Sequence, residues 1–582
     1  MKKLRNIIPM LLFPIIILYL FEWYTHNPFT TMKIRIQLLN IVLFELIMAL
    51  LLFLFGKLKT ALRCQTILFM IIGLANYYVL EFRSAPIMPW DILSIGTAAS
   101  VANNFKYTLS KETVFVLIGF VILLLLESKA TLELKKDWRI RVGGVLASFA
   151  LLWGFTAMLH QDSTVARFKL YDKLFTPTVM SKRDGTAVAF LMELKYIVVE
   201  KPDGYNKEDA AALLASYDTN DTESATHTPN IIVIMNEAFS DLSVLGDFET
   251  NEDYMPFLHS LMQEGTPNTI SGHLNVSVLG GNTANTEFEF LTGNTMAFLP
   301  QGSVAYQQYV KSNDYSIATY LKSKGYDTIA MHPYNASGWD RDKVYPLLGF
   351  DTFYSLKDWV NPVKIRKYVS DQSCYDKIIE LYEQKDANTP FFLFNVTMQN
   401  HSSYSEEYDN FHPDITVEGT SSKILPNYLS LIKLSDQALE NLIEYFSKAD
   451  EDTVIVFFGD HQPSNSVAAP VWKLNGRSGD SLTEEEEARR YKVPFIIWAN
   501  YDIEAASNVE TSANYLGSHV LRAAGLPLYD SRNYLSQLEE QCPVLTAIRA
   551  ENAQGISTPV KDVKSTLQDY MILQYYNIFS QK

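Results

Sequence analysis

The sequence predicts an N-terminal transmembrane domain of five helices, followed by an extracellular α/β domain in which a mostly parallel sheet carries helices on both faces. Three observations predict this arrangement. Five apolar stretches lie within the first 160 of the 582 residues. Beyond them, short uncharged apolar runs alternate with helical patterns, which is typical of parallel strands buried on both faces. The charge changes at the same point, because residues 1–160 carry 16 Lys and Arg against 8 Asp and Glu, a net charge of +8, whereas the remainder carries −24.

The five predicted membrane spans cover residues 6–24, 36–56, 64–82, 113–127 and 140–159. A span needs about 20 mainly apolar residues, because lipid offers no hydrogen-bond partner to the backbone. The fourth stretch is short, but its sequence VFVLIGFVILLLL contains no charge. With the N-terminus inside, the inner segments hold eleven Lys and Arg and the outer loops five, in agreement with the positive-inside rule. We therefore expect a multi-pass protein of the cell membrane, with the chain beyond about residue 160 outside the cell.

The composition excludes several classes of protein. Apolar residues make up 48% and charged residues 20%, so extended disorder is not expected. Three cysteines rule out a disulfide-built scaffold, and the net charge of −16 argues against a nucleic-acid partner. We expect four segments, namely the transmembrane domain (1–160), juxtamembrane helices with a linker (161–228), the α/β domain (229–550) and a helical C-terminal tail (551–582).

Side chains that can bind a metal or move a proton follow four of the predicted strands. The apolar runs predicted as strands are 230–235, 327–331, 391–398, 453–458 and 495–498. Ligands of open α/β sheets bind beyond the carboxyl ends of the strands. The residues that follow the first four runs are Asn236 and Glu237, then His332, then Gln399, Asn400 and His401, and finally Gly459, Asp460 and His461. Carboxylate and imidazole donors suit Mn²⁺, Mg²⁺ or Zn²⁺, so the sequence predicts a metal site at this sheet edge.

A hydroxyl nucleophile is predicted in the segment LGGNTANTEFEFLTG, where two glycines form a tight turn before a helix that Thr283 opens. The unpaired N–H groups of a helix N-terminus stabilise a phosphate oxyanion. The alternative is that Thr283 only caps the helix, with Thr286 or Glu287 completing the cap, and spacing alone favours this alternative. The sequence contains no GxSxG elbow, no P-loop and no cysteine in a formylglycine-type motif.

Taken together, the motifs resemble the lipoteichoic acid synthase family, within the alkaline-phosphatase/sulfatase-like superfamily. The segments that carry the resemblance are, in chain order, MNEAFSDL, GGNTANTEFEFLTG, GWDRD, MQNHSSY and FFGDHQPS. The resemblance implies an extracellular sulfatase-like catalytic domain that binds one divalent ion, usually Mn²⁺ in the family, with Zn²⁺ and Mg²⁺ as alternatives. The implied metal ligands are Glu237, Thr283, Asp460 and His461. It also implies that Thr283 is the nucleophile, with His401 as a further catalytic residue, and that the substrate pocket is formed by Trp339, Arg341 and His401.

Two positions depart from the family pattern. Well-studied members tend to have Ser after the metal-binding Glu and Lys before the nucleophile, whereas this chain has Ala238 and Asn282. We therefore expect the metal site to be intact and the surroundings of the phosphate to differ. The resemblance gives His332 no firm role, and we expect it to support the metal ligands from behind or to be structural, and not to bind the metal itself.

The activity that the resemblance implies is phosphoglycerol transfer at the membrane. The donor would be phosphatidylglycerol, and the acceptor a glycolipid, a polyglycerol-phosphate chain or a wall polysaccharide in the envelope of a Gram-positive type bacterium. The reaction would pass through a phospho-threonine intermediate at Thr283. Phosphoethanolamine transfer and hydrolysis by a sulfatase or phosphodiesterase are the alternatives on the same fold. A membrane-anchored binding protein without activity is a third alternative, which the complete set of metal-binding residues disfavours.

Overall fold

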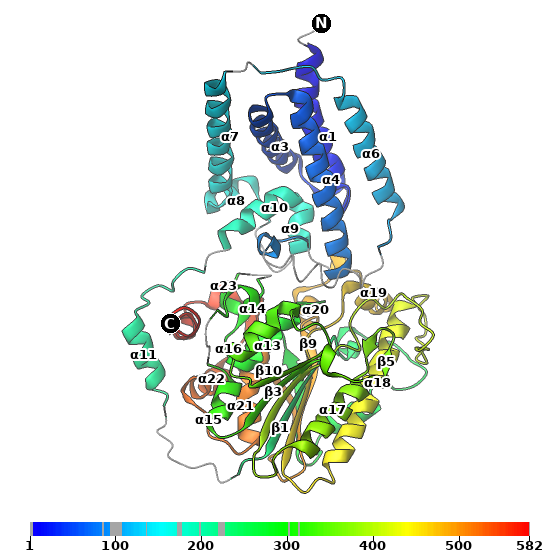
Figure 1. Ribbon diagram of the computed structural model, residues 1–582, viewed down its shortest axis with the longest axis vertical. Coiled ribbons are helices and arrows are strands. Elements are labelled where there is room, and N and C mark those ends of the chain that lie inside the picture. The colour runs from blue at the N-terminus through cyan, green and yellow to red at the C-terminus, as the bar shows by residue number, and fades with distance from the viewer. Residues whose placement is uncertain are drawn as a thin grey trace. The chain divides into compact units, whose positions relative to one another are not determined.

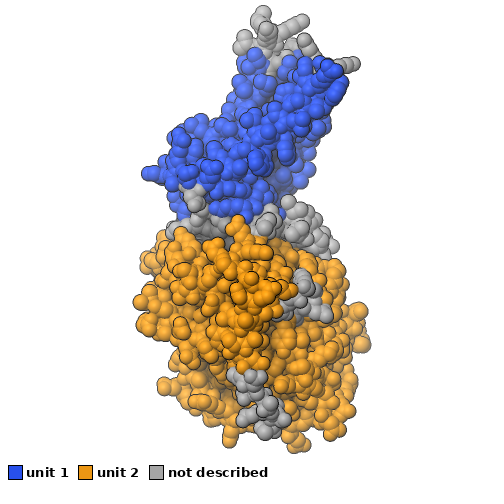
Figure 2. All heavy atoms as spheres, turned by 90° about the vertical axis from the view of Figure 1, so that its left-hand side faces the viewer, with its two compact units in different colours: residues 1–92, 106–198 blue, residues 93–105, 199–582 orange. Residues whose placement is uncertain are grey.

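The computed structural model describes residues 4–83, 86–92, 107–134, 137–171, 177–196, 199–218, 227–300, 303–311 and 315–580 (Figure 1). The chain forms two compact units, one of residues 1–92 and 106–198 and the other of residues 93–105 and 199–582 (Figure 2). Each unit contains its own clusters of buried apolar side chains.

Helices occupy all five stretches that the sequence predicts as membrane spans. They are α1 (Leu4–Glu22), α3 (Ile34–Phe55), α4 (Leu58–Arg83), α6 (Lys111–Glu127) and α7 (Trp138–Leu159), and the short α2 (Pro28–Thr31) follows α1. Three apolar segments, Ile34–Phe55, Leu58–Glu81 and Trp138–Leu159, are long enough to cross a membrane. The apolar part of α1 (Ile7–Glu22) and the 17-residue α6 are shorter, so three helices among the described residues have the length and composition of a span, and the count of five stays a prediction. Phe115 and Trp153, 71% and 70% exposed, show the outward apolar surface that a lipid environment would cover.

Short helices that follow α7 also belong to this first unit. They are α8 (Asp162–Phe168), α9 (Pro177–Asp184) and α10 (Thr186–Glu193). The main-chain N–H and the hydroxyl of Thr186 both donate to the Glu22 carboxylate at 2.9 Å, and Asn40 Nδ2 donates to the Asp184 carbonyl at 2.8 Å. These contacts tie the juxtamembrane helices to α1 and α3, and the unit extends to residue 198. Of the expected linker, α11 (Lys207–Ala215) is described, whereas residues 219–226 lie outside the described residues.

The second unit is built on an eight-stranded sheet with the order β10-β2-β9-β8-β1-β7-β3-β4. The strands are β1 (Asn230–Asn236), β2 (Thr269–Asn275), β3 (Asp327–His332), β4 (Thr352–Ser355), β7 (Phe391–Val396), β8 (Thr453–Gly459), β9 (Lys492–Ala499) and β10 (Ala506–Ser512). All neighbouring strands are parallel except β9, which runs antiparallel to both β8 and β2. The mostly parallel sheet is therefore confirmed. The five apolar runs correspond to β1, β3, β7, β8 and β9, and the strands that the sequence does not reveal are β2, β4 and β10.

Helices cover both faces of this sheet because successive strand residues point to opposite sides. On one face, Ile231 and Val233 of β1 contribute to a core with α13 (Thr283–Thr292), α14 (Ala305–Gln308), α15 (Ile317–Ser323), α16 (Arg341–Leu347) and α21 (Ala513–Ala523). On the other face, Ile232 and Ile234 contribute to a core with α12 (Pro256–Leu261), α17 (Asp371–Gln384), α18 (Ile424–Phe446) and α19 (Asn465–Leu474). Figure 1 shows α17 and α18 together on one side of the strands.

The C-terminal part of the chain packs against the end of α13. It contains α22 (Asp530–Gln541), the strands β11 (Val544–Leu545), β12 (Arg549–Glu551) and β13 (Ser557–Pro559), and the helices α23 (Val560–Val563) and α24 (Gln568–Phe579). Gln574 of α24 accepts from the Thr295 N–H at 2.8 Å and donates to its carbonyl at 2.9 Å. Tyr570 donates to the Gly293 carbonyl at 2.6 Å, so α24 secures the turn that ends α13.

Candidate active site

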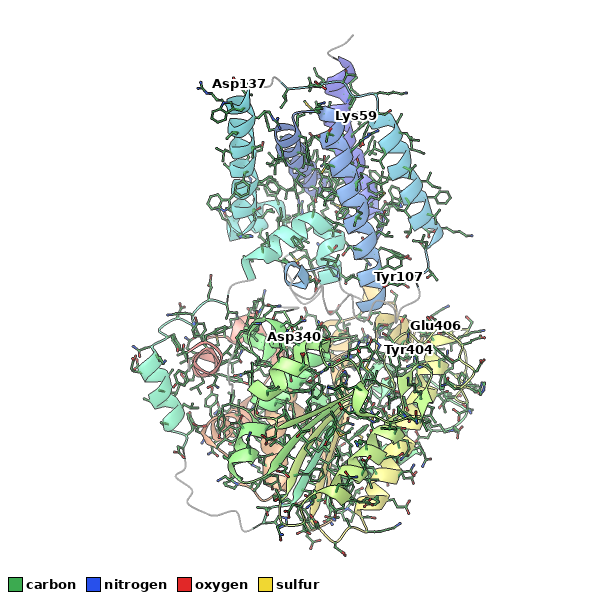
Figure 3. The ribbon with its side chains drawn as sticks, in the orientation of Figure 1. Lys59, Tyr107, Asp137, Asp340, Tyr404 and Glu406 are labelled. Atoms are coloured by element: carbon green, nitrogen blue, oxygen red, sulfur yellow. The ribbon has the colours of Figure 1, made fainter. Side chains whose placement is uncertain are left out.

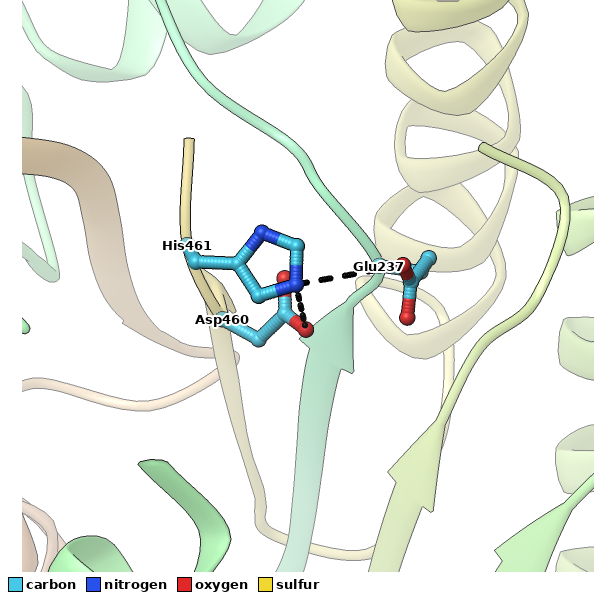
Figure 4. A group of neighbouring side chains, drawn as sticks. All are labelled: Glu237, Asp460 and His461. Atoms are coloured by element: carbon cyan, nitrogen blue, oxygen red, sulfur yellow. Dashed lines mark ion pairs between the residues drawn. The ribbon is translucent and has the colours of Figure 1, made fainter. Parts of the chain in front are cut away.

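The carboxyl ends of β1 and β8 bring two carboxylates and an imidazole together. Asn236 and Gly459 are paired in the sheet, so Glu237 and Asp460 leave their strands at the same level. His461 Nε2 lies 3.2 Å from Asp460 Oδ2 and 3.9 Å from Glu237 Oε1 (Figure 4). One possible ligand atom from each of these three buried residues lies within 4.8 Å of the others. We refer to Glu237, Asp460 and His461 as the metal group.

The backbone around the metal group turns sharply and leaves little space. Ala238 has a φ of 50°, and its N–H donates to Asp460 Oδ1 at 2.7 Å. A Cβ atom at Gly459 would lie 1.9 Å from the carbonyl oxygen of Phe239, so only glycine permits this approach of the two strand ends.

Thr283 reaches the metal group from the N-terminus of α13. The three residues before it, Gly280, Gly281 and Asn282, have φ values of 68°, 152° and 65°, so the chain enters the helix through a left-handed turn. Thr283 is the first helical residue, and its hydroxyl donates to Glu237 Oε2 at 3.4 Å. Asn282, not Thr283, occupies the N-cap position, which removes the support for the capping alternative.

The two other residues considered for that cap have different partners. The Thr286 hydroxyl donates to the main-chain carbonyl of Asp460 at 2.8 Å, and Glu287 binds Arg341. The first turn of α13 is therefore fixed against the strand end that carries Asp460.

The chemistry of the metal group fits a divalent cation. Burial raises the pKa of both Glu237 and Asp460, and the negative charge of Asp460 raises that of Glu237 further. Asp460 Oδ2 and His461 Nε2 are buried and face each other, but the pair lacks the geometry of a hydrogen bond. Neither atom has a hydrogen-bond partner among the described residues. Two buried carboxylates, one imidazole and the Thr283 hydroxyl form an oxygen- and nitrogen-rich donor set of the kind that Mn²⁺, Zn²⁺ or Mg²⁺ accepts. The donor set does not select one of these ions.

His401 and His332 lie at the ends of the neighbouring strands in different surroundings. His401 follows β7, and its Nδ1 lies 2.9 Å from the Ser402 carbonyl oxygen and 3.1 Å from the Tyr368 hydroxyl. Burial lowers the pKa of His401 to about 4, so the ring is neutral near pH 7. His332 ends β3, is buried, and its Nδ1 donates to the Val396 carbonyl at 3.0 Å. His332 thus joins the ends of β3 and β7, the structural position expected for it.

Arg341 is held by the carboxylate of Glu287, a contact that the sequence does not predict. It opens α16, is 2% exposed, and its Nε donates to Glu287 Oε1 and Oε2 at 3.0 and 3.3 Å. Arg341 Nη2 also donates to Glu287 Oε1. The positive charge of Arg341 opposes the rise in the pKa of Glu237. The guanidinium therefore acts on the metal group even though it is paired with Glu287.

Trp339 lies in the short segment Gly338–Asp340 before α16. Trp339 and Asp340 both have left-handed backbone angles, with φ values of 56° and 58°, and Asp340 is labelled in Figure 3. The Trp339 ring is partly buried against the core that contains α13. Of the contacts between described residues, no hydrogen bond or ion pair joins Trp339 to the metal group. The structure therefore brings Glu237, Thr283, Asp460 and His461 together. Trp339 packs against the core that contains α13.

A buried polar network behind the metal group is absent from the sequence prediction. Asp371 of α17 accepts from Asn236 Nδ2 at 2.7 Å and from the Ser435 hydroxyl of α18 at 2.6 Å. Asn400 Nδ2 donates to Asn236 Oδ1 at 2.9 Å and to Ser435 Oγ at 2.8 Å. Tyr404, labelled in Figure 3, donates to the Asn400 carbonyl at 2.7 Å. Only Asn236 and Asn400 could be found from the sequence, because they follow strands.

A mostly parallel sheet with acidic and histidine side chains at the carboxyl ends of its central strands defines an alkaline-phosphatase-like α/β domain. The chain belongs to the Sulfatase family, because residues 229–526, just over half of the chain, match the model of that family. This confirms the resemblance to the alkaline-phosphatase/sulfatase-like superfamily.

Two relatives and one solved structure show what the chain is similar to. It is 27% identical over 459 residues to the "Putative cyclic beta-1,2-glucan modification protein" of Rhizobium meliloti, covering 77% of this chain and 70% of that protein. It is 26% identical over 275 residues to lipoteichoic acid synthase 1 of Bacillus subtilis, covering 46% of this chain and 41% of that protein. The phosphoglycerol transferase GacH of Streptococcus pyogenes, solved with sn-glycerol-1-phosphate, shares the fold with a TM-score of 0.52 and 22% identity, covering 65% of this chain and 94% of that chain.

Proposed function

We propose that the protein is a membrane-bound, metal-dependent phosphoglycerol transferase that moves glycerol phosphate from phosphatidylglycerol to an acceptor in the cell envelope. The observation that carries the proposal is the position of the Thr283 hydroxyl, 3.4 Å from Glu237 at the N-terminus of α13. A hydroxyl at this place combines a metal site with the N–H groups of a helix start, as phosphoryl transfer needs. The similarity to lipoteichoic acid synthase 1 agrees with an acceptor in the cell envelope, and the donor is the one that the resemblance to that family implies.

In the proposed mechanism, the residues of the chain divide the reaction into two transfers. A divalent ion held by Glu237, Thr283, Asp460 and His461 would supply positive charge that favours the ionised hydroxyl and the phosphoryl oxygens. Thr283 Oγ1 attacks the phosphorus of the lipid, the bond to the diacylglycerol oxygen breaks, and that oxygen takes up a proton as diacylglycerol leaves. An acceptor hydroxyl then attacks the phosphorus of the phosphothreonine, the bond between phosphorus and Thr283 Oγ1 breaks, and Oγ1 takes up the proton that the acceptor hydroxyl releases.

The surrounding side chains have proposed roles in binding and proton transfer. Arg341 pairs with phosphate oxygens, because a guanidinium can share its N–H groups between a carboxylate and a phosphate. Trp339 packs on the glycerol moiety. His401 either protonates the leaving oxygen, for which the negative charge of the bound donor must raise its pKa, or binds the glycerol phosphate as a neutral ring. His401→Gln separates these roles, since loss of binding raises KM whereas loss of proton transfer lowers kcat.

The covalent step is tested with labelled phosphatidylglycerol and Mn²⁺. The full-length protein should release diacylglycerol and yield a labelled peptide that contains Thr283. Thr283→Ala should lose both products. Thr292→Ala is the matched control, because Thr292 is a buried threonine at the other end of α13 whose hydroxyl donates to the Phe288 carbonyl. Normal turnover by Thr283→Ala would exclude the phosphothreonine, and ethanolamine release from phosphatidylethanolamine would replace the proposed donor.

The proposed acceptors are a glycolipid, a polyglycerol-phosphate chain or a wall polysaccharide. The match to the glucan modification protein covers 77% of this chain, more than the match to lipoteichoic acid synthase 1, and so favours a glucan among these acceptors. Mass analysis of envelope polymers with and without the protein tests this choice. Loss of glycerol phosphate from a glucan alone would identify it as the acceptor, and loss from a glycolipid would contradict that choice.

We also propose that five helices cross the cell membrane and that the domain over 229–550 lies outside the cell. The supporting observation is the distribution of Lys and Arg between the loops, eleven in the inner segments and five in the outer loops. Protease added to intact cells should digest the catalytic domain and leave the membrane helices protected. A domain that is digested only after lysis would contradict this orientation.

A further inference from the structure

A buried ion pair joins the helix of the proposed nucleophile to the helix that carries Arg341. Glu287 of α13 is 0% exposed and Arg341 of α16 is 2% exposed. The Nε–Nη2 edge of the guanidinium donates to the Glu287 carboxylate, and the Tyr345 hydroxyl donates to Glu287 Oε2 at 2.8 Å. The carboxylate is thus fully engaged by two residues of one helix, α16.

The Nε–Nη2 edge of the Arg341 guanidinium and its Nη1 atom have different hydrogen-bond contacts. The Nε–Nη2 edge is occupied by Glu287, whereas Nη1 contacts only the Gly338 carbonyl, at a long 3.4 Å, among the described residues. A two-point contact to a carboxylate fixes the plane of a guanidinium, which a single contact does not. Glu287 therefore sets the direction in which Nη1 points.

The spacing within α13 relates this pair to the proposed nucleophile. Thr283 and Glu287 are four residues apart, so their side chains lie on the same face of the helix, one turn from each other. The Thr283 hydroxyl contacts Glu237 of the metal group, and the Glu287 carboxylate contacts Arg341. Helix α13 therefore fixes the position of the Thr283 hydroxyl directly and the orientation of the Arg341 guanidinium through Glu287.

We propose that Glu287 is a positioning residue, which holds one edge of Arg341 so that Nη1 faces the phosphate oxygens of the donor beside Thr283. This inference rests on the proposed function, because it requires a phosphodiester donor at Thr283. It assigns Arg341 a fixed orientation before substrate arrives, and it predicts that the loss of Glu287 weakens phosphate binding while the residues of the metal group stay in place.

A matched residue on the same helix, Glu289, distinguishes the positioning role of Glu287 from a purely structural role. Glu289 is also buried, at 1% exposure, but it accepts from Ser277 Oγ at 2.8 Å, Thr295 Oγ1 at 3.1 Å and the Met296 N–H at 2.8 Å. Glu289→Gln and Glu287→Gln therefore each replace a buried carboxyl group of the same helix by an amide, and only the second change removes a contact of Arg341.

The test measures binding of sn-glycerol-1-phosphate and turnover of phosphatidylglycerol by the full-length protein in Mn²⁺. We expect Glu287→Gln to weaken glycerol phosphate binding and raise the KM at least about tenfold, with no loss of affinity for Mn²⁺. Glu289→Gln should bind both as the wild type does. In an Arg341→Gln background, adding Glu287→Gln should weaken binding no further, because Glu287 acts through Arg341.

Each outcome decides the proposal. Equal binding by Glu287→Gln and Glu289→Gln, or additive losses in the double variant, would overturn it. If Glu287→Gln does not fold, Tyr345→Phe removes one hydrogen bond from the same carboxylate and should raise the KM by a smaller factor, and an unchanged KM would count against the proposal. A wild-type protein that neither binds glycerol phosphate nor turns over the lipid would refute the proposed function itself, whereas an active wild type with an unaffected Glu287→Gln refutes only the positioning role.

Discussion

The main-chain N–H of Ala238 donates a 2.7 Å hydrogen bond to Asp460 Oδ1 and so links the segments that leave β1 and β8. The other oxygen of this carboxylate, Oδ2, faces His461 Nε2 at 3.2 Å. Because Ala238 directly follows Glu237 and has a φ of 50°, the turn in the backbone orients the Asp460 side chain. The geometry of the metal group therefore depends on a backbone conformation as well as on the ligands themselves.

The first prediction concerns this turn. A β-branched residue is strongly disfavoured at positive φ, so Ala238→Val should move the N–H away from Asp460 and weaken Mn²⁺ binding about tenfold, or about 1.4 kcal/mol. Isothermal titration of the full-length protein measures the affinity. Asn361→Val is the control, because Asn361 also has a positive φ of 48° and lies on the surface. Equal Mn²⁺ affinities in the two variants would show that the Ala238 turn does not orient the site.

A second prediction concerns the close approach at Gly459. The Cβ of Gly459→Ala would overlap the Phe239 carbonyl oxygen at 1.9 Å, and because this oxygen belongs to the backbone and not to a flexible side chain, the strand ends must separate. We expect a lowered Tm together with loss of Mn²⁺ binding. Gly476→Ala serves for comparison, since Gly476 has a φ of 69° and its Cβ would meet no atom within 4 Å. That variant carries only the left-handed strain of about 1–2 kcal/mol and should bind Mn²⁺ normally.

Metal binding should stabilise the second unit. A ligand that binds only the folded state adds about 2.7 kcal/mol at a hundredfold excess over its Kd. We expect Mn²⁺ to raise the Tm of the protein and a chelator to lower it, with no shift in Asp460→Asn. The exposed Asp409→Asn should keep the full shift. An Mn²⁺ shift that survives in Asp460→Asn would place the ion elsewhere.

The stability of the protein should depend on pH through the ionisation of His259. Its Nδ1 lies 2.8 Å from Asp253 Oδ2 and its Nε2 3.5 Å from Asp241 Oδ2. Hydrogen bonding to Asp241 raises the pKa of His259 from 6.5 to about 9, although burial opposes this shift. A raised pKa in the folded state stabilises fully below pH 6.5, and the contribution is lost as the pH rises through about 9.

We therefore expect the Tm to fall between about pH 6.5 and 9, and to fall less in His259→Gln. His519→Gln is the control that leaves His259 in place and should retain the wild-type slope. Thermal unfolding followed by circular dichroism at several pH values provides the measurement. An identical slope in His259→Gln and the wild type would contradict the assignment.

The sequence predicted those parts of the fold whose residues are buried on both sides. β1 and β8 are continuous apolar runs and were found, whereas β2 (TISGHLN) and β10 (ASNVETS) mix polar and apolar residues near the sheet edge and were not. The metal group was found because its members follow strands. The partnership of Glu287 with Arg341 was not, because it depends on how two helices pack, which spacing along the chain does not determine.

The last prediction separates the stability of the Glu287–Arg341 pair from its role in binding. Removing one partner of a buried ion pair leaves an uncompensated charge and costs about 3–5 kcal/mol, whereas replacing both can be nearly neutral. Arg341→Gln and Glu287→Gln should therefore each lower the Tm of the second unit, and the double variant should lose less than the sum, because two amides can hydrogen bond to each other. Lys343→Gln, which breaks the exposed pair of Lys343 with Asp340, should change the Tm little. If the double variant regains stability but still binds glycerol phosphate poorly, the weak binding cannot be a consequence of unfolding. Additive losses in Tm would show that the two side chains do not stabilise one another.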